Sequence, residues 1–348
     1  MRAVALGALL FSLSGGGCFT GDYLLQQGVG QLALMHERRR ISEVLADPAV
    51  SADTKRRLAL ARSARDFGVE VLGLHGGDAY TRFVDTHGAP LAYNVWAAPK
   101  LKLEPYGHHF PIAGTVPYLG YFRKKDAIAE ARKLEARGFD VFVGEVAGYS
   151  TLGVTSDPVF SSMLEGSDAR IVEVTLHEML HGTLYLPGHS AWNESLAEFV
   201  GMEGAALYFR MTGRGEKAAR QVFVEAAERN ARAERFSRFL APIVKELEAL
   251  YASPRSGAEK LRLRKEVFAR ARAEYARAFP SKPGEPRSIF AVGPLNNAVL
   301  LVFRVYHGET PDHARILRRL DGNLAAFIRL YKHAVKDEDD PLGYLKKF

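Results

Sequence analysis

The order of apolar and polar residues predicts helices at both ends of the chain and short strands between them. Apolar residues recur at helical intervals over residues 23–46 and again over residues 54–72, which predicts a helical hairpin within residues 18–75. From residue 168 to residue 348 nearly all of the sequence has helical periodicity. Its most charged stretch, residues 216–279, is typical of paired helices that turn their Arg and Glu side chains toward solvent.

The segment between these helical parts has a different pattern. Over residues 76–160, short runs rich in aromatic and β-branched residues alternate with glycine and proline, which is typical of the strands of a small sheet. One helix, predicted over residues 124–138, interrupts the strands. We therefore predict a mainly helical α+β fold with a small mixed β-sheet, in a single domain over residues 18–348.

Residues 1–17 have the layout of a secretory signal peptide. Arg2 precedes an apolar run over residues 3–13 that is too short to span a bilayer, and small residues then lead to Cys18. This segment resembles the lipobox of bacterial lipoproteins, in which the cysteine is acylated, although Gly15 stands where that pattern usually has leucine. The resemblance implies a location in the cell envelope, with a lipid on Cys18 anchoring the chain to a bacterial membrane, facing the periplasm or the exterior. The alternative is an ordinary cleaved signal followed by an unpaired thiol.

Charge and cysteine content narrow the partners and cofactors. Lysine and arginine exceed aspartate and glutamate by seven among 348 residues, but acids are interleaved with the bases, so we predict no nucleic-acid partner. The single cysteine leaves no internal disulfide and no multi-cysteine zinc site. The sequence does not indicate the oligomeric state.

His177, Glu178 and His181 form the pattern H-E-x-x-H inside an apolar helical run. Positions four apart on an α-helix differ by about 40° around the axis and by about 6 Å along it, so both imidazoles project from one face and can bind one ion. Glu178 flanks that face, where it can reach a water molecule without being a ligand itself. The alternative is a core helix whose histidines are hydrogen-bonded to backbone or carboxylate groups, and a third ligand would decide between the two.

The sequence after the motif predicts a turn and a return helix. We expect the motif helix to continue past His181 through Leu186 and to stop at Pro187. A new helix is expected to begin near Ser190, with Ser190 or Asn193 as its N-cap. An antiparallel return of this length brings the first turn of the new helix back to the level of the two histidines.

Glu194 is the third ligand that this return helix would supply. A catalytic zinc takes three protein ligands, so His177, His181 and Glu194 are predicted to bind one Zn²⁺ ion. Glu198 follows one turn later on the same face. Because metal-bound histidines commonly donate their second ring proton to a carboxylate, Glu198 is predicted to accept that of His177.

At these residues the sequence resembles the gluzincin metallopeptidases, whose third ligand is a glutamate on the helix after H-E-x-x-H, often within an "NE" pair such as Asn193 and Glu194. It is also similar to a bacterial family of predicted aminopeptidases of lipoprotein type. The segments that carry this similarity are "GQLALMHERRRISEVLADP", "RLALARSARDFGVEVLGL", "YNVWAAPKLKLEP", "FPIAGTVPYLGYF", "GFDVFVGEVAGYSTLGVTSDPV", "HEMLHGTLYLPG", "NESLAEFVGMEG" and "LNNAVLLVFRVYH". His189 stands where the resemblance leads us to expect an acidic residue, so no role is carried over to it.

The resemblance implies a zincin-like fold, with the small sheet beside the H-E-x-x-H helix, and a zinc-dependent hydrolysis of peptide bonds. His177, His181 and Glu194 would bind zinc, and Glu178 would be the general base. The protein would be an aminopeptidase that acts on peptides outside the cytoplasm. Two alternatives stay open, a zinc endopeptidase and a non-catalytic zincin-like envelope lipoprotein that serves as a binding module. Glu178 argues against the binding module, since a purely structural site needs no base.

The remaining candidates concern the oxyanion that forms in peptide hydrolysis, which needs a hydrogen-bond donor besides the metal. Tyr149 would supply it if residues 145–153 formed an edge strand beside the motif helix. Tyr185, placed on the motif helix one turn after His181, is a second candidate, although tyrosines in such positions are more often packing residues. His108 and His109 could supply another donor or a second metal site, but adjacent histidines on a strand or loop point in different directions, so we favour a polar loop for them.

An aminopeptidase must also bind the free α-ammonium of its substrate, usually through carboxylates. Glu145 and Glu203 are the candidates that the sequence offers, and nothing separates them from surface charges. Asn296 and Asn297 precede an apolar helical run and are predicted to be N-cap residues.

Overall fold

The computed structural model describes residues 23, 36–110, 114–146, 156–280, 288–305 and 313–347. By its internal contacts the chain divides into two compact units, Met1–Arg38 and Arg39–Phe348, and the elements that follow all belong to the second unit. The predicted signal peptide, Cys18 and residues 24–35 of the first predicted helix lie outside the described residues, so the predictions made for them stay predictions. The described end of that helix is shorter than predicted, because Arg39–Arg40 is a strand and the helix begins at Ile41. None of the described helices combines the length and the apolar character needed to cross a bilayer.

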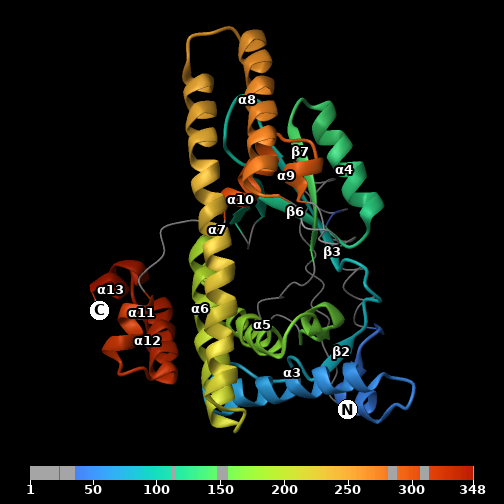
Figure 1. The fold of residues 1–348 in the computed structure, drawn as a ribbon, viewed down its shortest axis with the longest axis vertical. Helices are drawn as coiled ribbons and strands as arrows, with labels where there is room; N and C mark the ends of the chain where they lie inside the picture. The colour runs from blue at the N-terminus through green and yellow to red at the C-terminus, as the bar shows by residue number, and fades with distance from the viewer. Residues whose placement is uncertain are drawn as a thin grey trace, which may run out of the picture. The chain divides into compact units, whose positions relative to one another are not determined.

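Helices make up most of the second unit, and its strands form only small sheets, which confirms the α+β class (Figure 1). Its first helices are α2 (Ile41–Ala46) and α3 (Ala52–Glu70). The hydroxyl of Ser51 caps α3 by accepting a hydrogen bond from the backbone N–H of Thr54 at 3.1 Å. The second helix of the predicted hairpin is therefore confirmed, with a start two residues earlier than expected.

A small mixed sheet leads into the helix of the H-E-x-x-H motif. Its strands, in spatial order, are β1 (Arg39–Arg40), β2 (Arg82–Val84) and β8 (Val159–Phe160). The β1–β2 pair is antiparallel and the β2–β8 pair is parallel. A short 3₁₀ turn, η1 (Ser161–Leu164), continues from β8 and packs against the motif helix, α5 (Asp168–His181). The mixed sheet is thus joined to α5 by a few residues only.

A second sheet is antiparallel and lies between two helices. Its strands, in spatial order, are β6 (Tyr118–Tyr121), β3 (Ala92–Ala98) and β7 (Asp140–Val146). The helices that contact it are α4 (Lys124–Ala136) and α10 (Asn297–Val305). Trp96 and Ala98 of β3 pack with Ala298 and Leu301 of α10. Strand side chains alternate between faces, so the buried Val95 belongs to the opposite face, on which we place α4.

The motif helix α5 is surrounded by other helices. It packs against α3, α6 (Ser190–Met211) and α7 (Gly215–Ala252). Most of its side chains are buried, including Ile171, Val172 and Leu176, which are fully inaccessible. Because burial of an apolar face is what stabilises a helix of this length, these contacts fix α5 in place.

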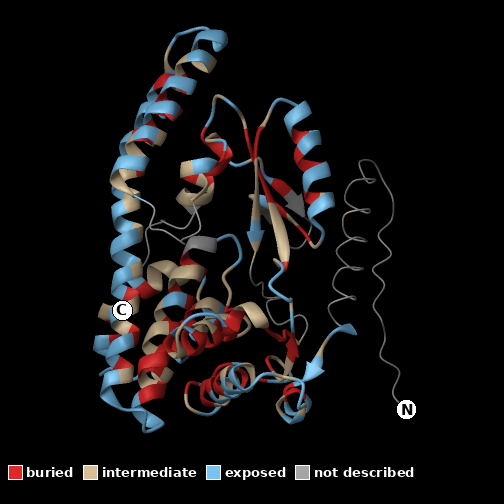
Figure 2. Cartoon of the chain, turned by 45° about the vertical axis from the view of Figure 1, so that its right-hand side comes forward, coloured by how far each residue is buried: buried red, intermediate tan, exposed pale blue. Residues whose placement is uncertain are grey.

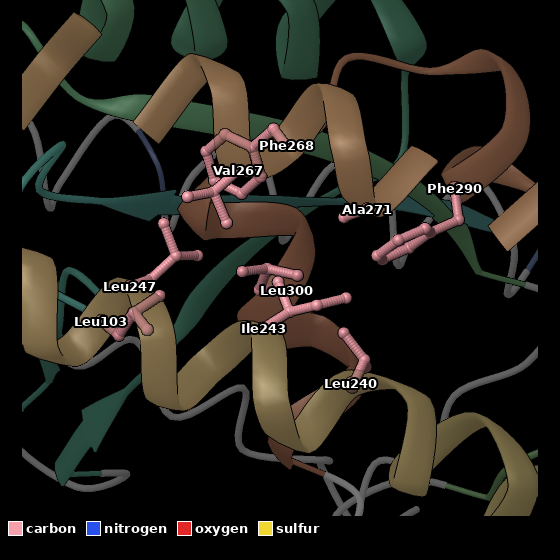
Figure 3. Packing of buried hydrophobic residues seen from close by; sticks show 9 residues of the cluster. All are labelled: Leu103, Leu240, Ile243, Leu247, Val267, Phe268, Ala271, Phe290 and Leu300. Atoms are coloured by element: carbon pink, nitrogen blue, oxygen red, sulfur yellow. The ribbon is translucent and has the colours of Figure 1, made fainter. Parts of the chain in front are cut away.

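The long helix α7 and α8 (Gly257–Ala278) form the pair predicted from the charged stretch. They alternate buried and exposed positions along their length (Figure 2). Their contact is a cluster of buried apolar residues, to which α9 (Ile289–Val292) and α10 contribute one residue each (Figure 3). The members are Leu103, Leu240, Ile243, Leu247, Val267, Phe268, Ala271, Phe290 and Leu300.

The C-terminal part is helical, as the periodicity after residue 168 predicts. Besides α9 and α10, the described residues form α11 (His313–Arg319), α12 (Leu324–Asp337) and α13 (Pro341–Lys347). Trp192 of α6 stacks on Tyr331 of α12 with ring centroids 6.0 Å apart, and Phe199 meets Phe327 at 5.4 Å. Trp192 and Phe199 are seven residues apart and share a face of α6. The C-terminal helices therefore support α6 through that face.

A buried polar cluster joins α8 and α10 to β7. The guanidinium of Arg264 donates to the carboxylate of Asp140 and, at 2.7 Å, to the carbonyl oxygen of Lys100. The backbone N–H of Asn297 donates to the same carboxylate at 3.0 Å. The hydroxyl of Tyr251 donates to Asn297 Oδ1 at 2.8 Å. We call Asp140, Arg264, Asn297 and Tyr251 the latch cluster.

Candidate metal centre

The start of α5 is fixed by a cap and by ion pairs. Ser167 Oγ accepts a hydrogen bond from the backbone N–H of Arg170 at 3.1 Å and so satisfies one of the free donors of the helix. Asp168, the first residue of α5, pairs with Arg56 at 2.6 Å and with Arg214 at 2.9 Å. A carboxylate in this position also interacts favourably with the helix dipole. These contacts tie α5 to α3 and to the residue that precedes α7.

The end of α5 differs from the prediction. The helix ends at His181, five residues before the expected end at Leu186. Gly182 follows as a poor helix former, and the hydroxyl of Thr183 donates to the carbonyl oxygen of Met179 at 2.7 Å. The same hydroxyl accepts a hydrogen bond from the backbone N–H of His75 at 2.8 Å. This contact with a residue 108 positions earlier is one reason why local periodicity places the end of α5 incorrectly.

The return helix begins where it was predicted, but its cap is different. Helix α6 starts at Ser190 with His189 as its N-cap residue, and no side chain caps it, so the prediction of Ser190 or Asn193 as the cap is wrong. Asn193 instead fixes the turn. Its Oδ1 accepts from the backbone N–H of Leu186 and its Nδ2 donates to the carbonyl oxygen of Leu186, both at 2.8 Å. The buried amide therefore holds the connection between α5 and α6 by two hydrogen bonds.

This connection brings His177, His181 and Glu194 together. The two imidazole Nε2 atoms are 3.1 Å apart. Glu194 Oε2 lies 3.5 Å from His177 Nε2, and Glu194 Oε1 lies 3.5 Å from His181 Nε2. One ligand atom from each residue lies within 4.8 Å of the others. Of the residues that the structure describes, these form the one His, Cys, Asp and Glu group able to hold a metal ion.

The geometry of the group fits a zinc ion. Bonds of about 2.0–2.1 Å from zinc in a tetrahedral arrangement put the ligand atoms about 3.3–3.4 Å apart. The observed separations of 3.1 and 3.5 Å lie on either side of that value. Two facing ring nitrogens repel each other unless a proton or a cation lies between them. Two imidazoles and a carboxylate are also a donor set of catalytic zinc sites, in which a fourth position stays open.

The charges in the group are strongly coupled. Burial lowers the pKa of His177, but its contact with Glu194 and the charges of Glu178 and Glu198 outweigh burial, so the pKa of His177 is raised. Burial raises the pKa of Glu194, but its contacts with His177 and His181 outweigh burial, so the pKa of Glu194 lies well below its usual range. The arrangement therefore favours a positive charge among these side chains.

Glu178 lies next to this group on α5 and is partly buried. Burial is the main reason why the pKa of Glu178 is raised, and the charges of Glu194 and Asp157 add to the effect. The two histidines oppose it. A carboxylate whose pKa lies closer to neutrality than that of a free glutamate suits a group that accepts and returns a proton.

Glu198 lies one turn after Glu194 on α6, as the spacing predicted. Its charge raises the pKa of His177, which places it in the electrostatic surroundings of the group. The described residues give its carboxylate no hydrogen bond to His177, so its role as the acceptor of the second ring proton stays a prediction. Loss of hydration is the main reason why the pKa of Glu198 is raised.

The two tyrosine candidates have different outcomes. Tyr149 lies outside the described residues, and so does the strand predicted over residues 145–153 beyond Val146. Tyr185 is not on the motif helix, because α5 ends at His181. It lies in the α5–α6 connection, where burial is the main cause of its raised pKa and the charge of Glu194 contributes. Tyr185 therefore lies close enough to Glu194 to be affected by its charge, but it is placed there by the α5–α6 connection and not by the motif helix.

His108 and His109 do not lie in a loop. They belong to β4 (His108–Phe110), which pairs with β5 (Gly114–Val116) in a two-stranded sheet. The ring of His108 is buried edge-on against Tyr106 with centroids 5.0 Å apart, and burial is the main reason why its pKa is lowered. His108 is thus a packed strand residue, and the prediction of a polar loop is wrong.

None of the contacts in the described part of the chain joins the other polar candidates to the group. Glu145 forms an exposed ion pair with Lys124 at 3.5 Å, and Glu203 is partly buried on α6. Asn296 Oδ1 accepts from the backbone N–H of Val299 at 3.0 Å, which confirms its role as an N-cap. Asn297 has a different role, because its side chain is fully buried in the latch cluster.

Two residues near the group were not anticipated. Gly201 of α6 lies against the backbone carbonyl of Glu173 and against His177 Cβ, both on α5, and a glycine within a helical pattern is the one sequence signal that marks it. Asp157 precedes β8, and its side chain is buried close enough to influence Glu178 electrostatically. No sequence pattern singles out Asp157, since its position depends on a contact between its carbonyl oxygen and the backbone N–H of Tyr80 at 2.7 Å.

Comparison with known proteins gives one match. The model of a protein family described as "Putative aminopeptidase" matches residues 22–340, which is nearly all of the chain after the predicted signal peptide. No curated protein and no solved structure matches the chain. The chain therefore belongs to the putative aminopeptidase family.

Proposed function

We propose that this protein is a zinc-dependent aminopeptidase that acts on peptides outside the cytoplasm. The observation that carries the proposal is the convergence of His177, His181 and Glu194, with ligand atoms separated by 3.1 and 3.5 Å. Membership of the aminopeptidase family supports peptides as the substrate class. Two imidazoles and one carboxylate support zinc as the metal, because carboxylate-rich sites with several oxygen ligands suit magnesium or calcium instead.

Glu178 is the residue that moves protons in this proposal. A zinc ion held by the three ligands would lower the pKa of a water molecule toward neutrality and polarise the scissile carbonyl. Glu178 accepts a proton from the attacking water and donates it to the leaving amine. Its position beside His177 and its raised pKa support this role. The half-exposed carboxylate of Glu194, with 40% of its side chain accessible, indicates that the group opens to solvent.

Removal of single N-terminal residues is the finer part of the proposal. It predicts that a peptide with a free α-ammonium is cleaved and that the same peptide with an acetylated N-terminus is not. Cleavage of both at internal bonds would identify an endopeptidase. Cleavage of a peptide library is therefore measured with and without chelator. A chain that binds zinc but cleaves no peptide in the library would be a binding module.

The envelope location is a further part of the proposal and rests on the sequence before Tyr23. Cys18 carries the lipid, and the mature chain begins there. Metabolic labelling with a radioactive fatty acid in a bacterial host tests it, with Cys18→Ser as the matched variant. Label in the wild-type chain that is lost in the variant would support the anchor, and equal absence of label in both would contradict it.

A further inference from the structure

Gly201 shares a face of α6 with the predicted metal ligand Glu194. The two residues are seven positions apart, which places them about 20° apart around the helix axis and about 10 Å apart along it. Glu198 lies between them on the same face. Since α6 runs antiparallel to α5, Gly201 meets α5 at the turn that carries Glu173 and His177.

The contact at Gly201 leaves no room for a side chain. A Cβ atom built at Gly201 would lie 2.8 Å from the backbone carbonyl oxygen of Glu173 and 3.3 Å from His177 Cβ. The first distance is shorter than Cβ atoms in proteins accept, and a backbone carbonyl within a helix cannot rotate away. Any side chain at position 201 therefore has to push α6 away from α5.

The part of α5 that Gly201 contacts is held in place by the ion pairs of Glu173. Glu173 is buried, and its carboxylate pairs with Arg170 at 3.2 Å and with Arg229 of α7. Only the carboxylate is buried, while the side chains of Arg170 and Arg229 are 45% and 39% accessible. The carboxylate still resists displacement, because movement away from the two guanidinium groups would leave a buried charge uncompensated. A push at position 201 is therefore transmitted to α6, which carries Glu194, rather than absorbed by α5.

We propose that Gly201 is a positioning residue that sets the distance between α5 and α6 and thereby holds Glu194 within reach of the two imidazoles. The proposal rests on the metal site proposed above. The ligand atoms lie 3.1–3.5 Å apart, so a displacement of several tenths of an ångström between the helices is large on the scale of the site. The residue touches the backbone beside one ligand and shares a helix face with another.

Gly204 provides a matched control on the same helix. A Cβ atom built there would lie 2.8 Å from Leu176 Cδ1 and 3.2 Å from Leu72 Cδ1. Both atoms are methyl ends of flexible side chains, which can turn aside without moving a backbone. A substitution at Gly204 therefore also crowds the packing around α6, but it does so against side chains and does not separate the ligand-bearing helices α5 and α6.

The test compares the wild-type chain with Gly201→Ala and Gly204→Ala. Metal-free thermal unfolding measures packing, chelator competition measures the zinc Kd, and the visible absorption of the Co²⁺-loaded protein reports ligand geometry. We expect both variants to lose thermal stability. Only Gly201→Ala should weaken zinc binding, by about 10- to 100-fold, the range found when groups that orient metal ligands are altered. Its Co²⁺ absorption should also lose the intensity typical of a tetrahedral site.

Equal zinc affinity and equal Co²⁺ spectra in the two variants would overturn the role of Gly201 while leaving the metal site intact. A wild-type chain that binds no metal would overturn both proposals. If Gly201→Ala does not fold, the comparison is repeated with a stabilising osmolyte, which favours the folded state. Failure to fold under those conditions, while Gly204→Ala folds, would show that Gly201 is needed for folding alone and would overturn its positioning role.

Discussion

The molecule contains two clusters of polar side chains that use similar chemistry for different ends. In the latch cluster, the carboxylate of Asp140 meets the guanidinium of Arg264 and the backbone N–H of Asn297, and all three residues are buried. In the metal group, the carboxylate of Glu194 meets two imidazoles and remains accessible over 40% of its side chain.

The difference lies in what completes each cluster. The carboxylate of Asp140 finds a fixed cation and a backbone donor within the chain, so the latch cluster needs nothing from outside. The Nε2 atoms of His177 and His181 face each other at 3.1 Å and need a proton or a metal ion between them. A cluster satisfied within the chain supports the fold, and a cluster that calls for an external cation points to function. Substitutions in the latch cluster should therefore affect mainly the stability of the fold, and substitutions in the metal group should affect mainly zinc binding and catalysis.

The largest expected effect is on catalysis. Glu178→Gln removes the proton acceptor while keeping size and shape, so kcat for peptide hydrolysis should fall by about 100- to 10,000-fold. Zinc affinity and thermal stability should stay close to those of the wild type, because Glu178 is not a ligand. A variant with normal zinc content and full peptidase activity would refute the role of Glu178.

The next effect is on stability and belongs to the latch cluster. Arg264→Met leaves the buried carboxylate of Asp140 without its cation, so the free energy of unfolding should fall by about 3–5 kcal/mol. Urea unfolding measures this loss. Asp140→Asn combined with Arg264→Met should recover part of it, since the uncompensated charge is then gone. The zinc Kd of the folded fraction should not change, and a weaker zinc Kd would show that the two clusters are coupled.

The metal group should give the metal-free protein a distinctive pH dependence. The pKa of His177 is raised above 6.5, so its contribution to stability is complete below that pH and is lost as pH rises through the raised value. The pKa of Glu194 is lowered below 4.5, so its contribution is complete above that pH and is lost as pH falls. The group therefore stabilises the metal-free chain most between about pH 4.5 and 6.5.

Urea unfolding in the presence of a chelator tests this window, with Glu194→Gln as the matched variant. The stability difference between the wild type and the variant should be larger at about pH 5.5 than at about pH 8. Zinc affinity should show the opposite trend and rise with pH, because the metal competes with protons for the same nitrogens. A stability difference that does not depend on pH would contradict the coupling between Glu194 and His177.

The smallest effect concerns one hydroxyl of the latch cluster. Tyr251→Phe removes the hydrogen bond to Asn297 Oδ1 and should lower the free energy of unfolding by about 1 kcal/mol. Activity should be unchanged. A measurable loss of activity without a loss of stability would mean that the latch cluster influences the metal group and is more than a structural contact.

The site could be predicted from the sequence as far as local geometry determines it. The positions of His177 and His181 follow from the period of the helix, and the start of α6 at Ser190 follows from the Pro-Gly turn before it. These two features suffice to bring Glu194 to the histidines, even though α5 ends earlier than expected. The α+β class is similarly visible in the change of hydrophobic period along the chain.

The rest depends on which hydrogen-bond partner each polar side chain finds, and periodicity does not encode this. Near the end of α5, the hydroxyl of Thr183 accepts a hydrogen bond from the backbone N–H of His75. Asn193 does not cap α6, because its side chain is hydrogen-bonded to the backbone of Leu186. Asn297 was predicted as a cap, yet its side chain is buried against Tyr251. These partners of Thr183 and Asn297 lie far away in the sequence, whereas Asn193 bonds to a backbone only seven residues earlier instead of capping its helix.

The metal content of the purified chain tests the central claim most directly. The wild type, Glu194→Ala and the control Glu203→Ala, which alters a carboxylate on the same helix, are loaded with zinc, dialysed and measured by mass spectrometry. We predict about one zinc ion per chain in the wild type and in Glu203→Ala, and much less than one in Glu194→Ala, because a catalytic zinc needs all three protein ligands. No zinc in the wild type, or full zinc content in Glu194→Ala, would contradict the metal site formed by His177, His181 and Glu194.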